Sequence, residues 1–223
     1  MEVGIQRSLL NEQVYNYIKE KIINDELKPN EKIDVTLLAK KLNVSRTPVT
    51  AALSRLQHDG YVTILPQSGT FVRNHSYNEL YIIYKSRAYL EKAIVETYGS
   101  QYRKAALLDI RRQFEELGGR DENPDDVQNQ LFAVDLKFHE MLLESCEEII
   151  RSNVISIADL TKRSRLLYFK LARDPATNLA RIRRNIKIHC DIIDALLTGD
   201  YDKAGQLVYN DIITTFDCIK SFI

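Results

Sequence analysis

The sequence predicts a mainly α-helical protein: an N-terminal winged helix-turn-helix domain, residues 1–74, followed by an all-α antiparallel helical bundle, residues 75–223. Three observations support this fold class. A short helix, a tight turn and a second helix precede Gly60. Alternation of apolar and polar residues then indicates a small β-hairpin. From Tyr77 onward there is no strand-like alternation of useful length, and helical periodicity takes its place.

The first helix is expected over Asn11–Leu27, with Val14, Ile18, Ile22 and Ile23 as its buried stripe. These apolar residues recur at helical spacing. The helix therefore serves as a scaffold for the motif that follows.

A shorter helix is expected over Val35–Leu42, after the favourable N-cap residue Asp34. Its leucines, Leu37, Leu38 and Leu42, are expected to form an apolar face. The next two residues make a tight turn into the second helix of the motif.

That second helix is expected over Val44–Val62 and carries different residues on two faces. Ser45 is its expected N-cap. The buried stripe is expected to consist of Val49, Ala52, Leu53 and Leu56. The candidates for DNA contact on this helix are Ser45, Arg46, Thr47, Thr50, Ser54 and Arg55.

A helix with a cationic and hydroxyl-bearing N-terminal end can enter the major groove of DNA, where Arg reads guanine edges and Ser or Thr reaches phosphates or bases. An ordinary amphipathic surface helix is the alternative. The preceding helix and turn favour DNA binding, because in a helix-turn-helix the first helix crosses the DNA backbone and the second lies in the groove.

The segment Tyr61–Asn74 is expected to form the hairpin wing. Gly69 is expected to supply a positive φ in the turn. Gln67 and Ser68 lie at the tip, where they can contact phosphate or the minor groove. These three residues complete the predicted DNA-binding set.

The run from Pro29 to Val72 resembles the N-terminal domain of the GntR family of bacterial transcriptional regulators. The resemblance rests on the SRTPV core, the L..L..DG pattern after it and the G..V wing. Family members commonly have Arg-Glu after the Pro-Val, and use that Arg on the operator, whereas this chain has Thr50 and Ala51. A bidentate contact is worth about 1–3 kcal/mol of discrimination, so we expect an operator that differs from the commonest family sequence.

The composition indicates a cytoplasmic protein. Of the 223 residues 44% are hydrophobic, enough to bury a core, but no apolar run approaches the length of about 18 residues that spans a membrane. The start has no basic region followed by an apolar stretch, so we expect no signal peptide. The three widely spaced cysteines, Cys146, Cys190 and Cys218, are not a disulfide framework. The net charge of zero divides into +2 through His75 and −2 after it, which supports a DNA-facing first half only weakly, because binding depends on a local patch.

Glycine and proline residues divide the second part of the chain into about six expected helices. Their approximate ranges are 77–98, 102–117, 125–145, 147–172, 176–198 and 200–222. The boundary near residue 146 is marked by neither Gly nor Pro.

Four side chains of this bundle form a candidate metal site. Asp135 and His139 lie four residues apart on one helix face, while His189 and Asp211 belong to two later helices. Facing helices of a bundle can hold a divalent ion with such ligands. The alternative is a surface or capping interaction of the Asp and His pair.

Several segments of the bundle resemble the FCD effector domain in its shorter, VanR-like form: RAYLE at 87–91, DLKFH at 135–139 and IHCDIIDALLTGDYDKA at 188–204. Many such domains bind Zn or Ni through one Asp and three His. The resemblance assigns three of these ligands to Asp135, His139 and His189, and puts Asp211 in the place of the third His. A carboxylate there favours harder ions such as Mn²⁺ somewhat more. A metal-free pocket, in which Asp135 and Asp211 hydrogen-bond a polar ligand directly, is the alternative. No organic cofactor is expected.

The resemblance implies a small carboxylate or sugar acid as effector. The candidates to bind it are Arg87, Arg163, Arg165 and Tyr168, because guanidinium groups bind carboxylates bidentately. Arg87 lies in an otherwise apolar and aromatic helix, which indicates a charge that faces inward, with Glu91 as a possible partner. Arg163 and Arg165 cannot share one helix face, so at most one points inward.

Together these features predict a homodimeric regulator that binds double-stranded, pseudo-palindromic operator DNA, does not associate with a membrane, and responds to a ligand in the helical domain. Two alternatives stay open. One is a DNA-binding adaptor whose bundle serves only dimerisation. The other is a helical metalloenzyme, although the sequence has neither a nucleophile and base pair nor a phosphate-binding glycine loop.

Overall fold

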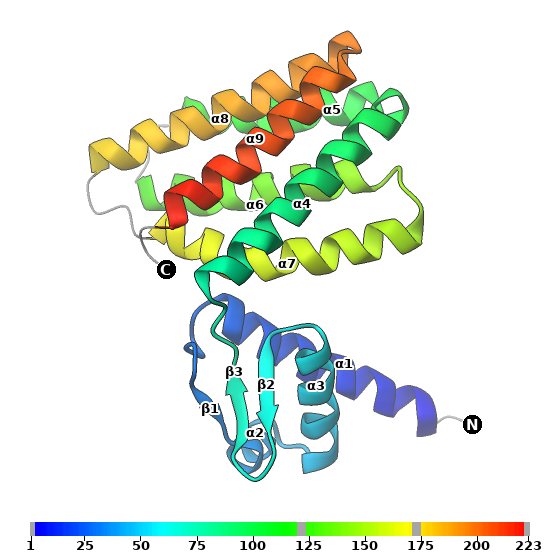
Figure 1. Ribbon diagram of the computed structural model, residues 1–223, viewed down its shortest axis with the longest axis vertical. Coiled ribbons are helices and arrows are strands. Elements are labelled where there is room, and N and C mark those ends of the chain that lie inside the picture. The colour runs from blue at the N-terminus through cyan, green and yellow to red at the C-terminus, as the bar shows by residue number, and fades with distance from the viewer. Residues whose placement is uncertain (1–2, 120–123, 171–174, 221–223) are drawn as a thin grey trace. The chain divides into compact units, whose positions relative to one another are not determined.

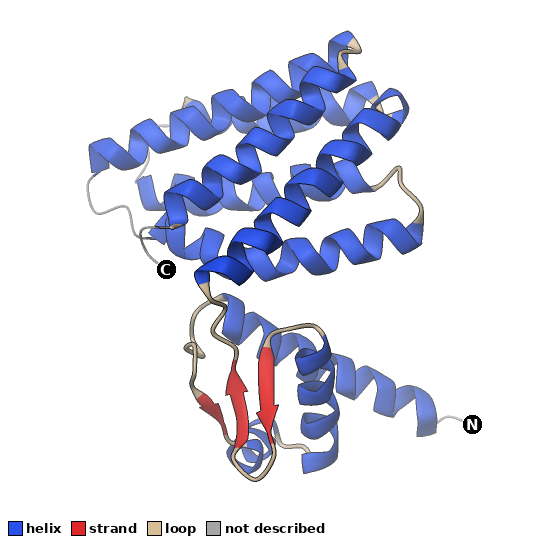
Figure 2. Cartoon of the chain, in the orientation of Figure 1, coloured by secondary structure: helices blue, strands red, loops and turns tan. Residues whose placement is uncertain are grey.

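The computed structural model describes residues 3–119, 124–170 and 175–220 of the chain. The chain divides into two compact units, Met1–Ser76 and Tyr77–Ile223. The first unit combines helices with a small sheet, and the described part of the second is helical throughout (Figures 1 and 2).

The first unit has the expected order of a helix, a helix-turn-helix and a hairpin, with one short strand added. Its elements are α1 (Val3–Ile23), β1 (Lys32–Ile33), α2 (Val35–Leu42), α3 (Arg46–His58), β2 (Val62–Leu65) and β3 (Gly69–Val72). Helix α1 begins and ends earlier than predicted. It ends before Leu27 because Asp25 takes a positive φ of 60° and the backbone turns there.

Helix α2 begins at a capping side chain and ends at one left-handed residue, which starts the turn into α3. The Asp34 side chain accepts hydrogen bonds from the backbone N–H of Thr36 (2.8 Å) and Leu37 (3.0 Å), as expected of an N-cap. Asn43 has a φ of 53°, a conformation that Asn tolerates better than most residues. Ser45 is the N-cap of α3 but makes no side-chain capping hydrogen bond.

The predicted apolar face of α2 is wrong in one residue. Leu37 is 66% exposed, and the residue this helix buries is Ala39. Two residues along a helix correspond to a rotation of about 200°. With the Ala39 face directed into the unit, Leu37 therefore faces solvent.

The sheet has three strands in the order β1-β3-β2, all antiparallel. The hairpin pairs Leu65 with Gly69, and Gly69 has a φ of 117°, so the predicted positive φ is confirmed. Strand β1 pairs Lys32 with Phe71. The sequence did not predict this strand, because two residues are too few to establish alternation.

The second unit is the expected helical bundle (Figure 1). Its elements are α4 (Tyr77–Tyr98), the 3-10 turn η1 (Gly99–Gln101), α5 (Lys104–Gly118), α6 (Pro124–Leu143), α7 (Glu148–Lys170), α8 (Pro175–Thr198) and α9 (Tyr201–Ile219). The break left unmarked by Gly or Pro falls between Leu143 and Glu148. No helix in the described residues is long and apolar enough to cross a membrane.

One large apolar cluster joins these helices and includes the buried rings of Tyr84, Phe114, Phe138 and Phe216. Helix α4 packs against α7 and α9, and α8 packs against α5 and α9. Within this apolar surrounding, α4, α6, α7, α8 and α9 each bury polar or charged side chains. These side chains form the site described next.

Candidate DNA interface and metal centre

Helix α3 separates a buried from an exposed face. Val49, Ala52, Leu53 and Leu56 are buried, which confirms the predicted stripe. The side chains expected to contact DNA on this helix and its N-cap are all exposed: Ser45, Arg46, Thr47, Thr50, Ser54 and Arg55. The Thr50 hydroxyl donates a hydrogen bond to the Arg46 carbonyl oxygen at 3.0 Å.

Arg55 differs from the other candidates because it is held against α1. Its guanidinium pairs with Glu12 and lies 4.0 Å from the centre of the Tyr15 ring. The Tyr15 hydroxyl in turn donates to Asp59 at 2.7 Å. Arg55 therefore joins α3 to α1, and contact with DNA would require it to give up at least part of this network.

The wing presents Gln67 and Ser68 as exposed side chains, and Gly69 is half-buried. Lys32 is a further exposed cation here that the sequence analysis did not single out. Its Cε would lie 2.8 Å from a Cβ added at Gly69, so the lysine stem runs along the wing. Its ammonium lies 5.9 Å from the centre of the Phe71 ring. The sequence analysis missed Lys32 because it did not predict the pairing of β1 with β3, which brings this residue to the wing.

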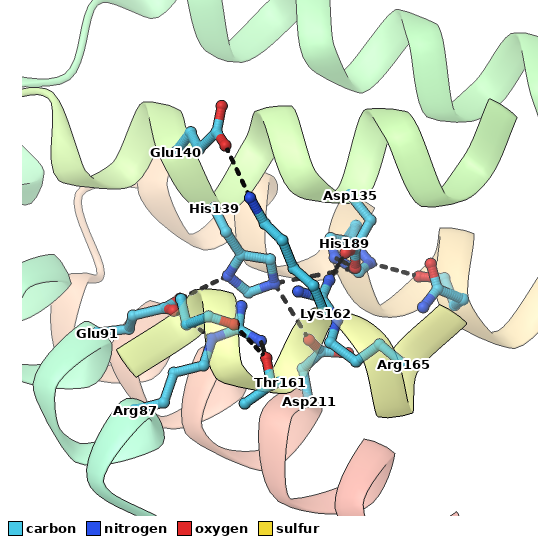
Figure 3. Close-up of polar contacts among 12 residues, drawn as sticks. Arg87, Glu91, Asp135, His139, Glu140, Thr161, Lys162, Arg165, His189 and Asp211 are labelled. Atoms are coloured by element: carbon cyan, nitrogen blue, oxygen red, sulfur yellow. Dashed lines mark hydrogen bonds and ion pairs between the residues drawn. The ribbon is translucent and has the colours of Figure 1, made fainter. Parts of the chain in front are cut away.

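The four candidate metal ligands meet inside the second unit (Figure 3). Asp135 and His139 come from α6, His189 from α8 and Asp211 from α9. One potential ligand atom from each lies within 4.8 Å of the others. Their exposed fractions are 3%, 4%, 0% and 6%, so the alternative of a surface ion pair is wrong.

Each imidazole is oriented by an acceptor on its far side. Nδ1 of His139 lies 2.5 Å from Oε2 of Glu91, and Nδ1 of His189 lies 2.9 Å from the backbone oxygen of Asn185. If Nδ1 donates the proton in both rings, both Nε2 atoms carry lone pairs toward the centre of the cluster. This arrangement of acceptor, imidazole and vacant Nε2 is the usual support of metal-binding histidines.

The central distances leave His189 poorly satisfied. Its Nε2 lies 3.2 Å from Oδ1 of Asp135 and has no hydrogen-bond partner among the described residues. Burial lowers the pKa of His189 to about 4, so the ring is neutral at pH 7. A neutral Nε2 lone pair then faces a carboxylate oxygen, and a cation between the two atoms would remove that repulsion.

Two buried carboxylates at the site, those of Glu91 and Asp211, are held in their charged form. Burial raises the pKa of Glu91, but Arg87 and His139 outweigh it and lower the value to about 2. Burial likewise opposes ionisation of Asp211, and His189 and His139 overcome that effect, so its pKa falls below the usual range. Two imidazole nitrogens and two carboxylates are a donor set that fits Zn²⁺ and related divalent ions.

Two arginines lie beside this cluster. Arg87 is buried and its Nε pairs with Oε1 of Glu91 at 2.6 Å, so the inward charge and the partner are as predicted. Its Nη1 donates to Oγ1 of Thr161 at 3.1 Å, while Nη2 has no hydrogen-bond partner among the described residues. Arg165 of α7 is also buried and pairs with Asp135.

Arg163 and Tyr168 are the other two effector candidates. Arg163 is only half-buried, in agreement with the prediction that at most one of Arg163 and Arg165 points inward. The side chain of Tyr168 lies outside the described residues.

A cavity of about 20 Å³ lies next to the cluster and is lined by Arg87, Glu91, His139, Lys162 and Arg165 among others. This space is about enough for one water molecule. Lys162 bridges Asp159 (2.7 Å) and Glu140 (3.8 Å), the latter across from α7 to α6 (Figure 3). A second cavity, of about 40 Å³, reaches Asp211 between α8 and α9.

Comparisons with known proteins agree with this two-part architecture. A family model described as "Bacterial regulatory proteins, gntR family" matches residues 10–72, and a model of the FCD domain matches residues 82–213. The solved structure of E. coli McbR/YncC aligns with a TM-score of 0.76 at 20% identity, over 96% of this chain and 98% of that chain.

Relatives in sequence cover most of the chain. The Nta operon transcriptional regulator of Aminobacter aminovorans is 30% identical over 203 residues, 90% of each chain. The HTH-type transcriptional regulator YdhC of Bacillus subtilis (strain 168) is 29% identical over 173 residues, 77% of each chain. The HTH-type transcriptional repressor GlaR of Escherichia coli is 24% identical over 92% of this chain. The chain therefore belongs to the gntR family of bacterial regulatory proteins and carries an FCD domain behind its helix-turn-helix domain.

Proposed function

We propose that this protein is a homodimeric repressor whose binding to operator DNA is controlled by a small carboxylate or sugar acid, held in the helical unit beside a divalent metal ion. The observation that carries the proposal is the buried cluster of Asp135, His139, His189 and Asp211, in which His189 Nε2 lacks a hydrogen-bond partner among the described residues. Two buried arginines lie next to it.

On the DNA side, the exposed N-terminal end of α3 would contact bases and phosphates, and the wing would contact phosphates. Arg46 and Thr47 head α3 without a competing salt bridge among the described residues, whereas Arg55 is engaged by Glu12. Thr50 has a short side chain where relatives commonly have Arg, so the operator differs at the base pair that this residue faces.

On the effector side, Asp135, His139, His189 and Asp211 would hold the ion, and the ion would supply an open Lewis-acid position for a carboxylate oxygen. Arg87 has a buried Nη2 with no hydrogen-bond partner among the described residues, and Arg165 lines the same cavity. A guanidinium that is already buried in the folded protein loses little further hydration when it binds a carboxylate. Small anionic ligands are therefore favoured over neutral ones.

Helix α4 links the two roles. It begins at Tyr77, the first residue of the second unit, and carries both Arg87 and Glu91. A ligand that moves these residues acts on the helix that leads directly from the DNA-binding unit. The same helix exposes Tyr81, Ile82 and Tyr89, an apolar surface that suits pairing with a second copy.

The proposal is tested by fluorescence anisotropy of the purified protein with DNA from upstream of its own gene. Affinity should fall steeply with salt, because phosphate contacts release counterions, and one member of a panel of carboxylates and sugar acids should weaken binding to metal-loaded protein. A complete switch needs about a 10⁴-fold difference in ligand affinity between the two states. If no small molecule changes operator affinity, the bundle serves only dimerisation. Turnover of a panel member would instead indicate an enzyme.

A further inference from the structure

We propose that Arg165 couples metal binding to anion binding. In this account it releases Asp135 when a divalent ion takes that carboxylate, and then pairs with the carboxylate of the ligand. The inference rests on the proposed function, because it concerns the same buried site. Arg165 would exchange the carboxylate of Asp135 for that of the ligand, in addition to sharing in ligand binding.

The two carboxylate oxygens of Asp135 face different partners. Oδ1 of Asp135 faces the centre of the cluster, 3.2 Å from Nε2 of His189 and 3.9 Å from Nε2 of His139. Oδ2 of the same residue pairs with Nη2 of Arg165. Both partners of that pair are 3% exposed. An ion bound at Oδ1 and a guanidinium at Oδ2 repel each other with little solvent to screen them.

The net charge of the site indicates how this repulsion would be relieved. With both imidazoles neutral, as metal binding requires, the buried carboxylates of Glu91, Asp135 and Asp211 exceed the two guanidinium groups of Arg87 and Arg165 by one negative charge. A divalent ion would turn that excess into one positive charge. Because an uncompensated buried charge is costly, the loaded site favours uptake of one monovalent anion.

Arg165 can reach such an anion without leaving the cavity that it already lines. The ligand would find Nη2 of Arg87, buried and without a hydrogen-bond partner among the described residues, in the lining of the same cavity. The guanidinium of Arg165 also lies 5.5 Å from the centre of the Phe132 ring, a cation–π contact in addition to its pair with Asp135. At about 20 Å³ the cavity admits little more than a water molecule, so ligand entry itself requires a side chain to move.

The test is a calorimetric titration of Zn²⁺ into chelator-stripped, full-length protein, with sodium acetate or with sodium chloride at equal ionic strength. Wild type should bind Zn²⁺ at least about 5-fold more tightly with acetate, the lower end of typical coupling. Arg165→Met should bind Zn²⁺ more tightly than wild type in chloride, because the competing cation is gone, and should not respond to acetate. Arg151→Met, which removes a partly exposed cation on the same helix, should behave as wild type.

Arg165→Lys separates this effect from misfolding. It keeps a cation beside Asp135, so its Zn²⁺ affinity in chloride should stay near that of wild type, while its response to acetate falls because an ammonium cannot bind bidentately. The inference is overturned if Arg165→Met keeps the acetate response, or if wild type binds Zn²⁺ without one. In that second case the proposed metal site stands. Failure of wild type to bind Zn²⁺ at all would overturn both.

Discussion

Helix α4 carries two ion pairs with the same spacing but very different burial, and they predict very different contributions to stability. The side chains of Arg87 and Glu91 are 2% and 0% exposed. Those of Lys92 and Glu96, also four residues apart, are 27% and 28% exposed. Glu91 additionally holds Nδ1 of His139 at 2.5 Å.

Replacing Glu91 by Gln keeps the side-chain shape but leaves the Arg87 charge buried without a counterion. Breaking a buried pair in this way costs about 3–5 kcal/mol. The matched variant Lys92→Met breaks a pair that is partly solvated, and exposed pairs contribute about 0.2–1 kcal/mol. The two changes on one helix should therefore differ by several kcal/mol in the free energy of unfolding.

Urea unfolding of metal-free, full-length protein, followed by far-ultraviolet circular dichroism, measures both. The double variant Arg87→Met with Glu91→Gln should recover more than half of the loss, because it removes the orphaned charge as well. Equal and small losses for Glu91→Gln and Lys92→Met would refute the reasoning. So would a double variant less stable than Glu91→Gln alone.

Three further predictions concern the DNA-binding unit. Arg46→Ala should cost about 1–3 kcal/mol of operator affinity and relax the preference for one base pair, as measured by anisotropy with operator variants. Lys32→Ala should weaken binding to all sequences alike and reduce the slope of log affinity against log salt by about one; a sequence-dependent loss would contradict its place on a phosphate. Burial raises the pKa of Asp59, but hydrogen bonds with His58 and Tyr15 outweigh it and hold the pKa below its ordinary value of 3.8. This stabilisation is present above the ordinary pKa and lost as pH falls further, so the difference in unfolding free energy between wild type and Asp59→Asn should narrow on acidification below pH 4.

Most of the fold could be predicted because each element leaves a local signature. Helical spacing of Val49, Ala52, Leu53 and Leu56 identified the buried face of α3, and alternation identified the hairpin. Local sequence patterns do not show which strand a very short strand pairs with. Strand β1, with Lys32 and its position at the wing, depends on pairing with β3, which no pattern within two residues encodes.

The candidate site was predictable in its members but not in their contacts. Spacing placed Asp135 and His139 on one face, and the sequence offered His189 and Asp211 on two later helices; the fold brings ligand atoms of all four within 4.8 Å of one another. Packing between helices distant in sequence brings Arg165 to Asp135 and Glu12 to Arg55. No local pattern shows these two pairs. The burial of Leu37 was predicted wrongly, because packing against neighbouring elements decides which face of an eight-residue helix is buried.

The measurement that tests the central claim most directly is the metal content of protein purified without a histidine tag or chelator, beside His139→Ala and Asp211→Ala. The account predicts about one divalent ion per chain in wild type and none in either variant, with helical content unchanged. Wild type that carries no metal and takes none up on titration would contradict it. The buried cluster would then be a metal-free pocket whose ligand is held by Arg87 and its neighbours alone.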